Sequence, residues 1–146
     1  MRRYAFGMGF FDKLRQSRTK TSNTAAVQQV EVPVLGYPRD GWSWKVAALK
    51  DKAVTTAVRE SGIEVAPGTH TDEDSTLVVL QRLKGPHVAV TMGSQILGYC
   101  PADEVERVNN RVRRVGRIAA APARLYLHTP EQVARGLSLW TIVVYA

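Results

Sequence analysis

Two short segments rich in apolar residues, within 86–99, form the clearest pattern along the chain and predict a β-hairpin. Gly93 and Ser94 separate two apolar segments by two residues, as in tight hairpin turns that need glycine. Residues that pair across such a turn share one face of the sheet. The pairing predicts one core-facing apolar surface, formed by Val88, Val90, Leu97 and Tyr99.

A helix is predicted directly after this hairpin, over residues 101–116. Pro101 suits a first turn because it lacks an N–H that would be unbonded there, and Gly116 is a typical helix end. Helical spacing predicts a core-facing side made of Val105, Val108, Val112 and Val115. On a separate flank, spacings of four and three residues predict a continuous basic stripe of Arg107, Arg111 and Arg114.

The remaining apolar segments predict a small β-rich domain. Strands are expected, from β-branched or alternating apolar residues, at 27–35, 76–83, 123–128 and 137–145. Pro33 indicates that the first strand lies at an edge or a bulge of the sheet. A second core-facing helix is expected at 45–62. This pattern favours a mostly β, α+β fold, namely a small OB-like curled sheet or barrel with two helices.

Length and composition limit the chain to one such domain with a tail. It has 146 residues, of which 45% are hydrophobic, which is enough for one core. Small polar residues at 18–26 have the composition of a linker. We therefore assign residues 1–26 to a flexible basic tail and linker, and residues 27–146 to the barrel domain. Met8 offers an alternative start to Met1.

The tail contains a short segment in which apolar and basic residues are interleaved, with Phe10, Phe11 and Leu14 as its apolar members. One interpretation is an amphipathic helix that docks on an anionic membrane surface or in a partner groove. The simpler interpretation is a frayed leader. No segment approaches the roughly 20 apolar residues that a membrane span needs.

Positive charge is concentrated in two segments of the chain. The formal net charge is +7, of which residues 1–20 contribute +5 and residues 107–124 contribute +6, so that the rest of the chain carries −4. This asymmetry fits a polyanionic partner, because lysine and arginine displace the counterions of phosphates. Proteins that bind no polyanion show it as well.

The loop predicted at 36–44 carries aromatic and basic side chains together, including Tyr37, Arg39 and Trp42. Such a cluster can stack nucleobases on its rings and bind phosphate through its arginine. The alternative is that these aromatic residues form the lid of the hydrophobic core.

Metal and catalytic motifs are weak in this sequence. Asp72, Glu73 and Asp74 lie near His70, but their spacing matches neither a calcium loop nor a zinc site, which favours a solvated acidic loop. Cys100 is the single cysteine and indicates a reducing compartment such as the cytoplasm. It lies at a predicted helix start, where a thiol pKa can be lowered, yet no signature pairs it with a histidine. We predict no enzyme activity and no cofactor.

Four segments carry a resemblance to a known family: Val-Leu-Gly-Tyr-Pro-Arg at 34–39, Leu-Gln-Arg at 80–82, His-Val-Ala-Val at 87–90, and the hairpin and helix start at 93–108. Through them the chain from about Val32 to Tyr145 resembles the HIRAN domain of fork-remodelling helicases and small bacterial proteins. The resemblance implies a modified OB-like barrel, which in helicase members binds the 3′ end of single-stranded DNA. It also implies base and phosphate contacts at Tyr37 and Arg39, joined by Trp42.

The chain departs from that family between its central strands. The family has an arginine there, followed by an asparagine-rich loop with Tyr-Asp, whereas residues 81–87 keep Arg82 and Lys84 without Asn, Tyr or Asp. We therefore predict no specific recognition of a DNA end. The predicted function is a non-catalytic nucleic-acid-binding module of a bacterial or phage protein, which contacts single-stranded or damaged, branched DNA mainly through its phosphates. The predicted contacts are Tyr37, Arg39, Trp42, Arg82, Lys84, Arg107, Arg111, Arg114 and Arg117. The alternative is a protein-interaction or adaptor module that docks through the amphipathic segment of the tail.

Overall fold

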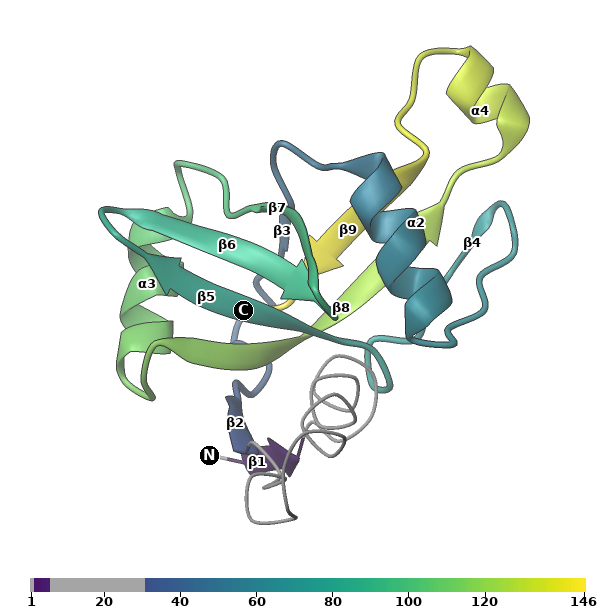
Figure 1. The fold of residues 1–146 in the computed structure, drawn as a ribbon. Helices are drawn as coiled ribbons and strands as arrows, with labels where there is room; N and C mark the ends of the chain where they lie inside the picture. Colours follow the sequence, from purple (N-terminus) through teal and green to yellow (C-terminus); the bar gives the residue numbers. More distant parts are fainter. Residues whose placement is uncertain (1, 6–30) are drawn as a thin grey trace, which may run out of the picture.

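The structure, a computed structural model, describes residues 2–5 and 31–146 and shows a strongly curled sheet with two helices packed against it and a third, short helix that projects from it (Figure 1). In the described residues the strands are β1 (Arg2–Ala5), β2 (Glu31–Val34), β3 (Trp44–Lys45), β4 (Thr69–His70), β5 (Leu77–Leu83), β6 (His87–Met92), β7 (Gln95–Tyr99), β8 (Ile118–Leu127) and β9 (Trp140–Val144). The helices are α2 (Asp51–Glu60), α3 (Val105–Arg113) and α4 (Pro130–Ala134). None of these helices is long and apolar enough to cross a membrane.

The sheet is built around β8, which is ten residues long and pairs with β2, β4, β5 and β9. The main strand order is β1-β2-β8-β5-β6-β7, and β9 joins β8 to β3. An isolated bridge between Ala47 and Tyr99 also links the segment after β3 to β7. The result is an open, strongly curled half-barrel, which confirms the predicted mostly β, OB-like α+β fold.

The predicted hairpin is present, but its register shifts part-way along. Met92 pairs with Gln95 across the two-residue turn, as expected, whereas Val90 pairs with Gly98 because a β-bulge follows. The predicted pairing of Val90 with Leu97 is therefore wrong. The bulge adds one residue to β7, as bulges do when a strand must bend. Three of the predicted core residues are buried and Tyr99 is half-buried.

Gly98 lies beside this bulge, at a position where another segment of the chain packs closely on β7. A Cβ atom at this position would lie 2.5 Å from Cγ1 of Val46 and 2.6 Å from the carbonyl oxygen of Ala47. The segment after β3 thus packs directly on the backbone of β7, and no residue larger than glycine fits without a shift.

The helices bury the faces that their periodicity predicts. Val108 and Val112 of α3 are fully buried, and the two outer valines of this face are partly buried against the same core. On α2 the buried residues are Val54, Ala57 and Val58. Because the valines hold one side of α3 against the sheet, its arginines are left on the other sides.

Element boundaries differ from the predictions where backbone geometry is special. The helix predicted at 45–62 begins only at Asp51, because residues 44–45 form β3 and Ala48 has a positive φ of 51°, which interrupts a helix. The helix predicted from Pro101 begins at Val105, after a turn in which Glu104 N–H donates to the Pro101 carbonyl.

Two further elements lie outside the predicted boundaries. β8 begins at Ile118, five residues before the start of the predicted strand. The prediction began too late because the alanines at 119–121 are not β-branched and so gave no strand signal. α4 was not predicted. Its capping box is formed by Thr129 and Gln132, so that a third helix follows the two expected ones.

The described part of the tail forms β1, which pairs antiparallel with β2 and was not expected as a strand. β2 is thus flanked on both sides, so the edge position, one of the two alternatives expected from Pro33, is wrong. Its hydrogen bonding to β8 begins only after the proline, where Leu35 N–H donates to Ala120 over 2.8 Å, so the missing N–H of Pro33 is not needed. Phe10, Phe11 and Leu14 lie outside the described residues.

Candidate functional site

A cleft of about 670 Å³ lies between α3 and the loop that follows β2, and we call it the basic cleft. Its lining residues are Arg107, Asn110, Arg111 and Arg114 from α3, with Tyr37, Pro38 and Arg39 from the loop. Four of these seven residues are arginines, and none of the seven is acidic. The structure thus brings five of the predicted contact residues together in one concave surface.

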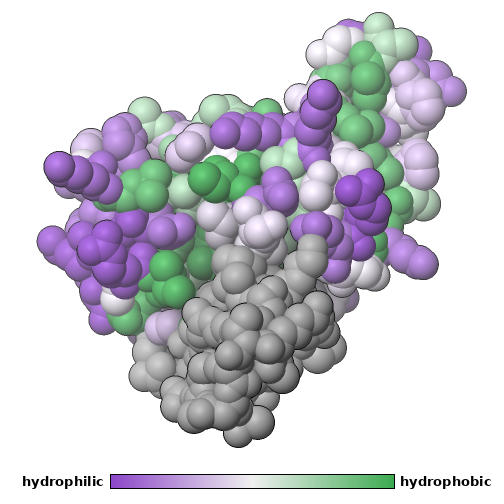
Figure 2. All heavy atoms as spheres, in the orientation of Figure 1, coloured by the Kyte–Doolittle hydropathy of each residue, from purple (hydrophilic) through white to green (hydrophobic). Residues whose placement is uncertain are grey.

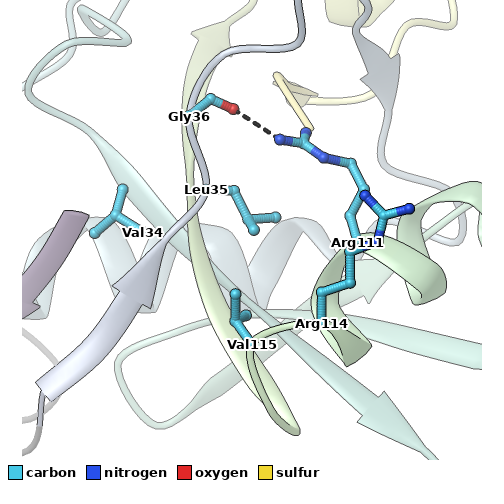
Figure 3. Close-up of a pocket in the computed structure, with 6 residues that line it drawn as sticks. All are labelled: Val34, Leu35, Gly36, Arg111, Arg114 and Val115. Carbon is cyan, nitrogen blue, oxygen red and sulfur yellow. Dashed lines mark hydrogen bonds between the residues drawn. The ribbon is translucent and has the colours of Figure 1, made fainter. Parts of the chain in front are cut away.

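Arg111 lines the basic cleft, and one of its guanidinium nitrogens has no hydrogen-bond partner among the described residues. Its Nη2 donates to the carbonyl oxygen of Gly36 over 3.1 Å, which is drawn in Figure 3. Its Nη1 is buried and has no hydrogen-bond partner among the described residues. Burial, followed by repulsion from Arg107 and Arg114, lowers the pKa of the Arg111 guanidinium. A buried donor without a partner is unfavourable by about 1–3 kcal/mol, and more when it is charged, so this nitrogen favours an anionic acceptor.

A smaller hollow of about 210 Å³ adjoins the cleft on the other side of Arg111 and Arg114. Its remaining lining residues are Val34, Leu35, Gly36 and Val115, and Figure 3 shows them around the two arginine side chains. Because three of these four residues have apolar side chains, the hollow offers little competition for the arginines.

Arg107 is held more firmly than its neighbours on the stripe. Its Nη2 donates to Oε1 of Glu104 over 2.9 Å and to the carbonyl oxygen of Ala146 over 2.8 Å. Its guanidinium carbon also lies 5.2 Å from the ring centroid of Trp42, whose Nε1 donates to the same carboxylate over 2.8 Å. Arg107 therefore anchors Trp42 and α3 together, and Glu104 offsets part of its charge.

Tyr37 closes the loop on the opposite side of the cleft. Its hydroxyl donates to Oδ1 of Asp74 over 2.7 Å, and its ring packs edge-on against Tyr145 at 5.8 Å. Burial raises the pKa of Tyr37, and the hydrogen bond to Asp74 raises it further. With the bonds at Gly36 and Trp42, the loop is fixed at three points to other elements, so the cleft is formed before any ligand arrives.

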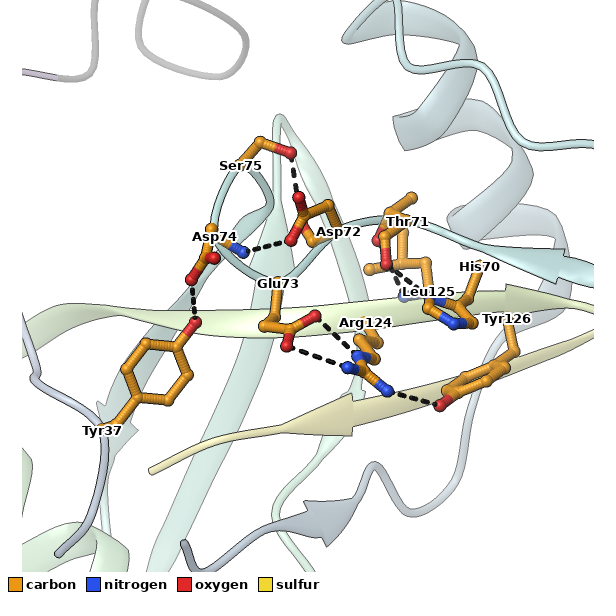
Figure 4. A network of polar contacts seen from close by, with 10 residues as sticks. All are labelled: Tyr37, His70, Thr71, Asp72, Glu73, Asp74, Ser75, Arg124, Leu125 and Tyr126. Atoms are coloured by element: carbon orange, nitrogen blue, oxygen red, sulfur yellow. Dashed lines mark hydrogen bonds and ion pairs between the residues drawn. The ribbon is translucent and has the colours of Figure 1, made fainter.

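The acidic loop that contains Asp72, Glu73 and Asp74 lies beside Tyr37 (Figure 4). Its carboxylates make hydrogen bonds to other parts of the protein, so the loop is not simply solvated. The Glu73 carboxylate accepts from Nε and Nη2 of Arg124 over 2.6 and 2.9 Å, and these bonds lower the pKa of Glu73 to about 2. Asp72 instead accepts from the backbone N–H of Asp74 over 2.9 Å. Within residues 2–5 and 31–146, no three His, Cys, Asp or Glu side chains are grouped as metal ligands.

Three predicted contact residues lie outside the basic cleft. Nε of Arg82 donates to Oδ1 of Asn109 over 2.9 Å, and the Arg82 backbone N–H donates to the carbonyl of Arg117 over 2.9 Å. Lys84 is exposed in the turn between β5 and β6. The predicted contact residues thus fall into two groups, and Trp42 adjoins the first group through its contact with Arg107.

Sequence patterns missed two residues of the cleft region. Asn110 lines the cleft, and its spacing of three and four residues from Arg107 and Arg114 is a signal that could have found it. Glu104, which bonds both Trp42 and Arg107, was not among the predicted contact residues.

Cys100 lies in an environment unlike that of a reactive thiol. It is buried, and burial raises its pKa to about 12, the opposite of the lowering expected at a helix start. Nδ1 of His70 lies 2.7 Å from the carbonyl oxygen of Thr71, and Nε2 of His128 lies 2.7 Å from Oγ1 of Thr141. In the described part of the chain no hydrogen bond joins Cys100 to a histidine.

Comparisons with protein-family models, with curated proteins and with solved structures gave no match for this chain. The resemblance to the HIRAN domain therefore stays a prediction. What the site can bind follows from the charges and contacts of its own residues.

Proposed function

We propose that this protein is a non-catalytic, HIRAN-like nucleic-acid-binding module that holds phosphates in the basic cleft. The observation that carries the proposal is the group of four arginines that line the basic cleft with no carboxylate among the lining residues. A phosphodiester in the cleft would accept hydrogen bonds from these guanidinium groups and offset the repulsion of Arg111 by Arg107 and Arg114.

A chain of phosphates suits the cleft better than a single small anion. Residues 107 to 114 extend over about 10 Å of helix, because each residue rises by about 1.5 Å. Arg39 adds a further cation from the facing loop. A polyanion with several phosphates would use this length, whereas one inorganic phosphate would reach only part of it.

Two aromatic side chains beside the cleft favour nucleic acid with unpaired bases. Tyr37 is 44% exposed and Trp42 is 45% exposed, although both rings are large and apolar. Exposed rings next to arginines are typical of sites where single-stranded bases stack. We therefore favour single-stranded, damaged or branched DNA as the ligand, in a reducing compartment such as the cytoplasm.

The alternative, a protein-interaction or adaptor module, depends on Phe10, Phe11 and Leu14, which lie outside the described residues. The three anchors of the loop and the arginines around Arg111 favour phosphate binding instead.

The test is a salt titration with a double variant of the cleft, Arg111→Gln with Arg114→Gln. Fluorescence anisotropy with single-stranded oligonucleotides should show at least about tenfold weaker binding, and the salt slope should fall by roughly 0.7 for each phosphate that the variant no longer neutralises. The control is Arg59→Gln with Arg135→Gln, which removes the same charge from exposed positions at the end of α2 and after α4. Equal weakening in both double variants, or no binding by the unmodified protein at low salt, would contradict the proposal.

A further inference from the structure

A second group of cations lies on the flank of α3 that faces away from the basic cleft. Successive helical residues turn by about 100°, so Arg113 lies about 40° from Asn109 around the helix and about 100° from Arg114. Asn109 is the residue that Arg82 of β5 contacts, over 2.9 Å. Arg113 and Arg82 therefore share this flank, which we call the outer flank.

Two more cations reach the outer flank from other elements. The backbone N–H of Arg82 donates to the carbonyl of Arg117, which places the residue before β8 beside the end of β5. Lys84 follows in the turn between β5 and β6. Figure 2 shows hydrophilic side chains gathered over this end of the molecule, where the β5–β6 turn lies near α3. We call the resulting group, formed by Arg82, Lys84, Arg113 and Arg117, the outer patch.

The charges of the outer patch are not neutralised by ion pairs in the described structure. The ion pairs found in residues 2–5 and 31–146 are Arg107 with Glu104 and Arg124 with Glu73, and neither involves the patch. Glu106 is on the same flank of α3, two turns before Arg113, and leaves a net positive charge there. Lys84, Arg113 and Arg117 are exposed, whereas Arg82 is half-buried and held by Asn109.

Of these four cations, only one has a position that favourable interaction with the helix dipole explains. Arg113 lies in the last turn of α3, where a cation interacts favourably with the helix dipole. The other three come from β5, from the turn after it and from the residue before β8. Their convergence on one surface is therefore a property of the tertiary structure.

We propose that the outer patch is a second phosphate-binding zone for the same nucleic acid, reached only by strands that extend beyond the basic cleft. This inference rests on the proposed function of the cleft. Arg114 is exposed at the end of α3, lines the cleft and precedes the turn that leads to Arg117, so it connects the two zones. A short strand fills the cleft alone, whereas a longer strand passes Arg114 and neutralises both zones.

The test compares two lengths of single-stranded DNA, of about 4 and about 20 nucleotides, which bracket the usual site sizes of OB-like domains. The patch variant combines Lys84→Gln, Arg113→Gln and Arg117→Gln, and keeps Arg82 because it holds Asn109. The cleft variant is Arg111→Gln with Arg114→Gln. A control variant with Lys52→Gln, Arg59→Gln and Arg135→Gln removes three exposed charges from outside both zones. Thermal unfolding checks that each variant folds.

The patch variant should bind the short strand within about twofold of the unmodified protein, but the long strand at least about tenfold more weakly, with the salt slope reduced by about 2. Equal weakening for both lengths, or an unchanged affinity for the long strand, would overturn the second zone while leaving the cleft intact. An unchanged affinity of the cleft variant for the short strand would instead overturn the proposed function, and so would failure of the unmodified protein to bind the short strand at low salt.

Discussion

Arg111 and Arg124 lie in two regions of the same domain and differ in how their guanidinium groups are satisfied. Arg124 bonds to both carboxylate oxygens of Glu73, and its Nη1 lies 3.4 Å from the hydroxyl of Tyr126. Arg111 bonds through Nη2 to Gly36, while its buried Nη1 has no partner among the described residues. Both arginines belong to the same basic segment of the sequence, so a run of positive charge does not by itself mark a binding site.

The difference lies in what the neighbouring loops supply. The acidic loop brings a carboxylate to Arg124, whereas the loop after β2 brings a backbone carbonyl and a further arginine to Arg111. The first region is thus complete as a structural ion pair, whereas in the second the Arg111 guanidinium has no carboxylate partner among the described residues. The following predictions test this contrast, from the largest expected effect to the smallest.

Overpacking the framework that carries both regions should lower the stability of the whole fold. Gly98→Ala places a Cβ against Val46 and the Ala47 backbone, and overpacking of this kind destabilises by about 2–3 kcal/mol. The free energy of unfolding, measured by urea titration, should fall by that amount. Gly36→Ala is the matched control, since its Cβ would meet nothing within 4 Å. Equal stability of the two variants would contradict the packing described for Gly98.

Replacing Arg111 by an apolar side chain should separate binding from stability. Arg111→Met should weaken binding of single-stranded DNA by about tenfold, which corresponds to roughly 1.4 kcal/mol. The free energy of unfolding should change by less than about 1 kcal/mol, because loss of the Gly36 bond is offset by loss of an unpartnered buried nitrogen. Arg124→Met should show the reverse, a lower Tm with binding within about twofold. The contrast between the two regions fails if Arg111→Met unfolds the protein or if Arg124→Met weakens binding as strongly.

The Glu73 ion pair should give the fold an acid-sensitive component. Arg124 lowers the pKa of Glu73 from 4.5 to about 2, so its stabilisation is complete above about pH 4.5 and is lost as the pH falls towards 2. Glu73→Gln lacks this component. The difference in Tm between the unmodified protein and Glu73→Gln should therefore shrink across that window in thermal scans. A difference that stays constant with pH would show that the pair contributes nothing.

Replacing Glu104, the acidic partner of Arg107, should slightly increase the affinity of the cleft for DNA. Glu104→Gln removes a negative charge beside the cleft and keeps an acceptor for Nε1 of Trp42. Affinity for single-stranded DNA should rise by about twofold to threefold at low salt and by less at high salt. Glu131→Gln, at an exposed position on α4, is the matched control. A loss of affinity in Glu104→Gln would mean that its carboxylate is needed to position the loop.

Local sequence patterns predicted the parts of this architecture that depend on short-range geometry. The turn at Gly93 and the arginine stripe on α3 follow from spacings of a few residues. The close packing of Val46 against Gly98 joins residues 52 positions apart, and no local pattern contains it. The capping box of Thr129 was present in the sequence and was overlooked.

The sequence predicted the charged residues that line the candidate site, but not which residues they contact. Tyr37 meets Asp74 across 37 residues, and Arg111 meets Gly36 across 75. Such contacts decide which arginines are neutralised, and they arise only when distant segments pack. This is why the sequence did not show that Arg82 and Arg117 lie outside the cleft that Arg111 lines.

The most direct test of the central claim observes the two arginine side chains during a titration with DNA. In ¹⁵N-labelled protein, the Nε–H signals of Arg111 and Arg124 can be assigned by comparison with Arg111→Gln and Arg124→Gln and then followed by NMR as single-stranded oligonucleotide is added at low salt. The Arg111 signal should shift and saturate with the binding curve, while the Arg124 signal, held by Glu73, stays in place. Movement of Arg124 without Arg111, or no movement of Arg111 at saturation, would contradict phosphate binding in the basic cleft.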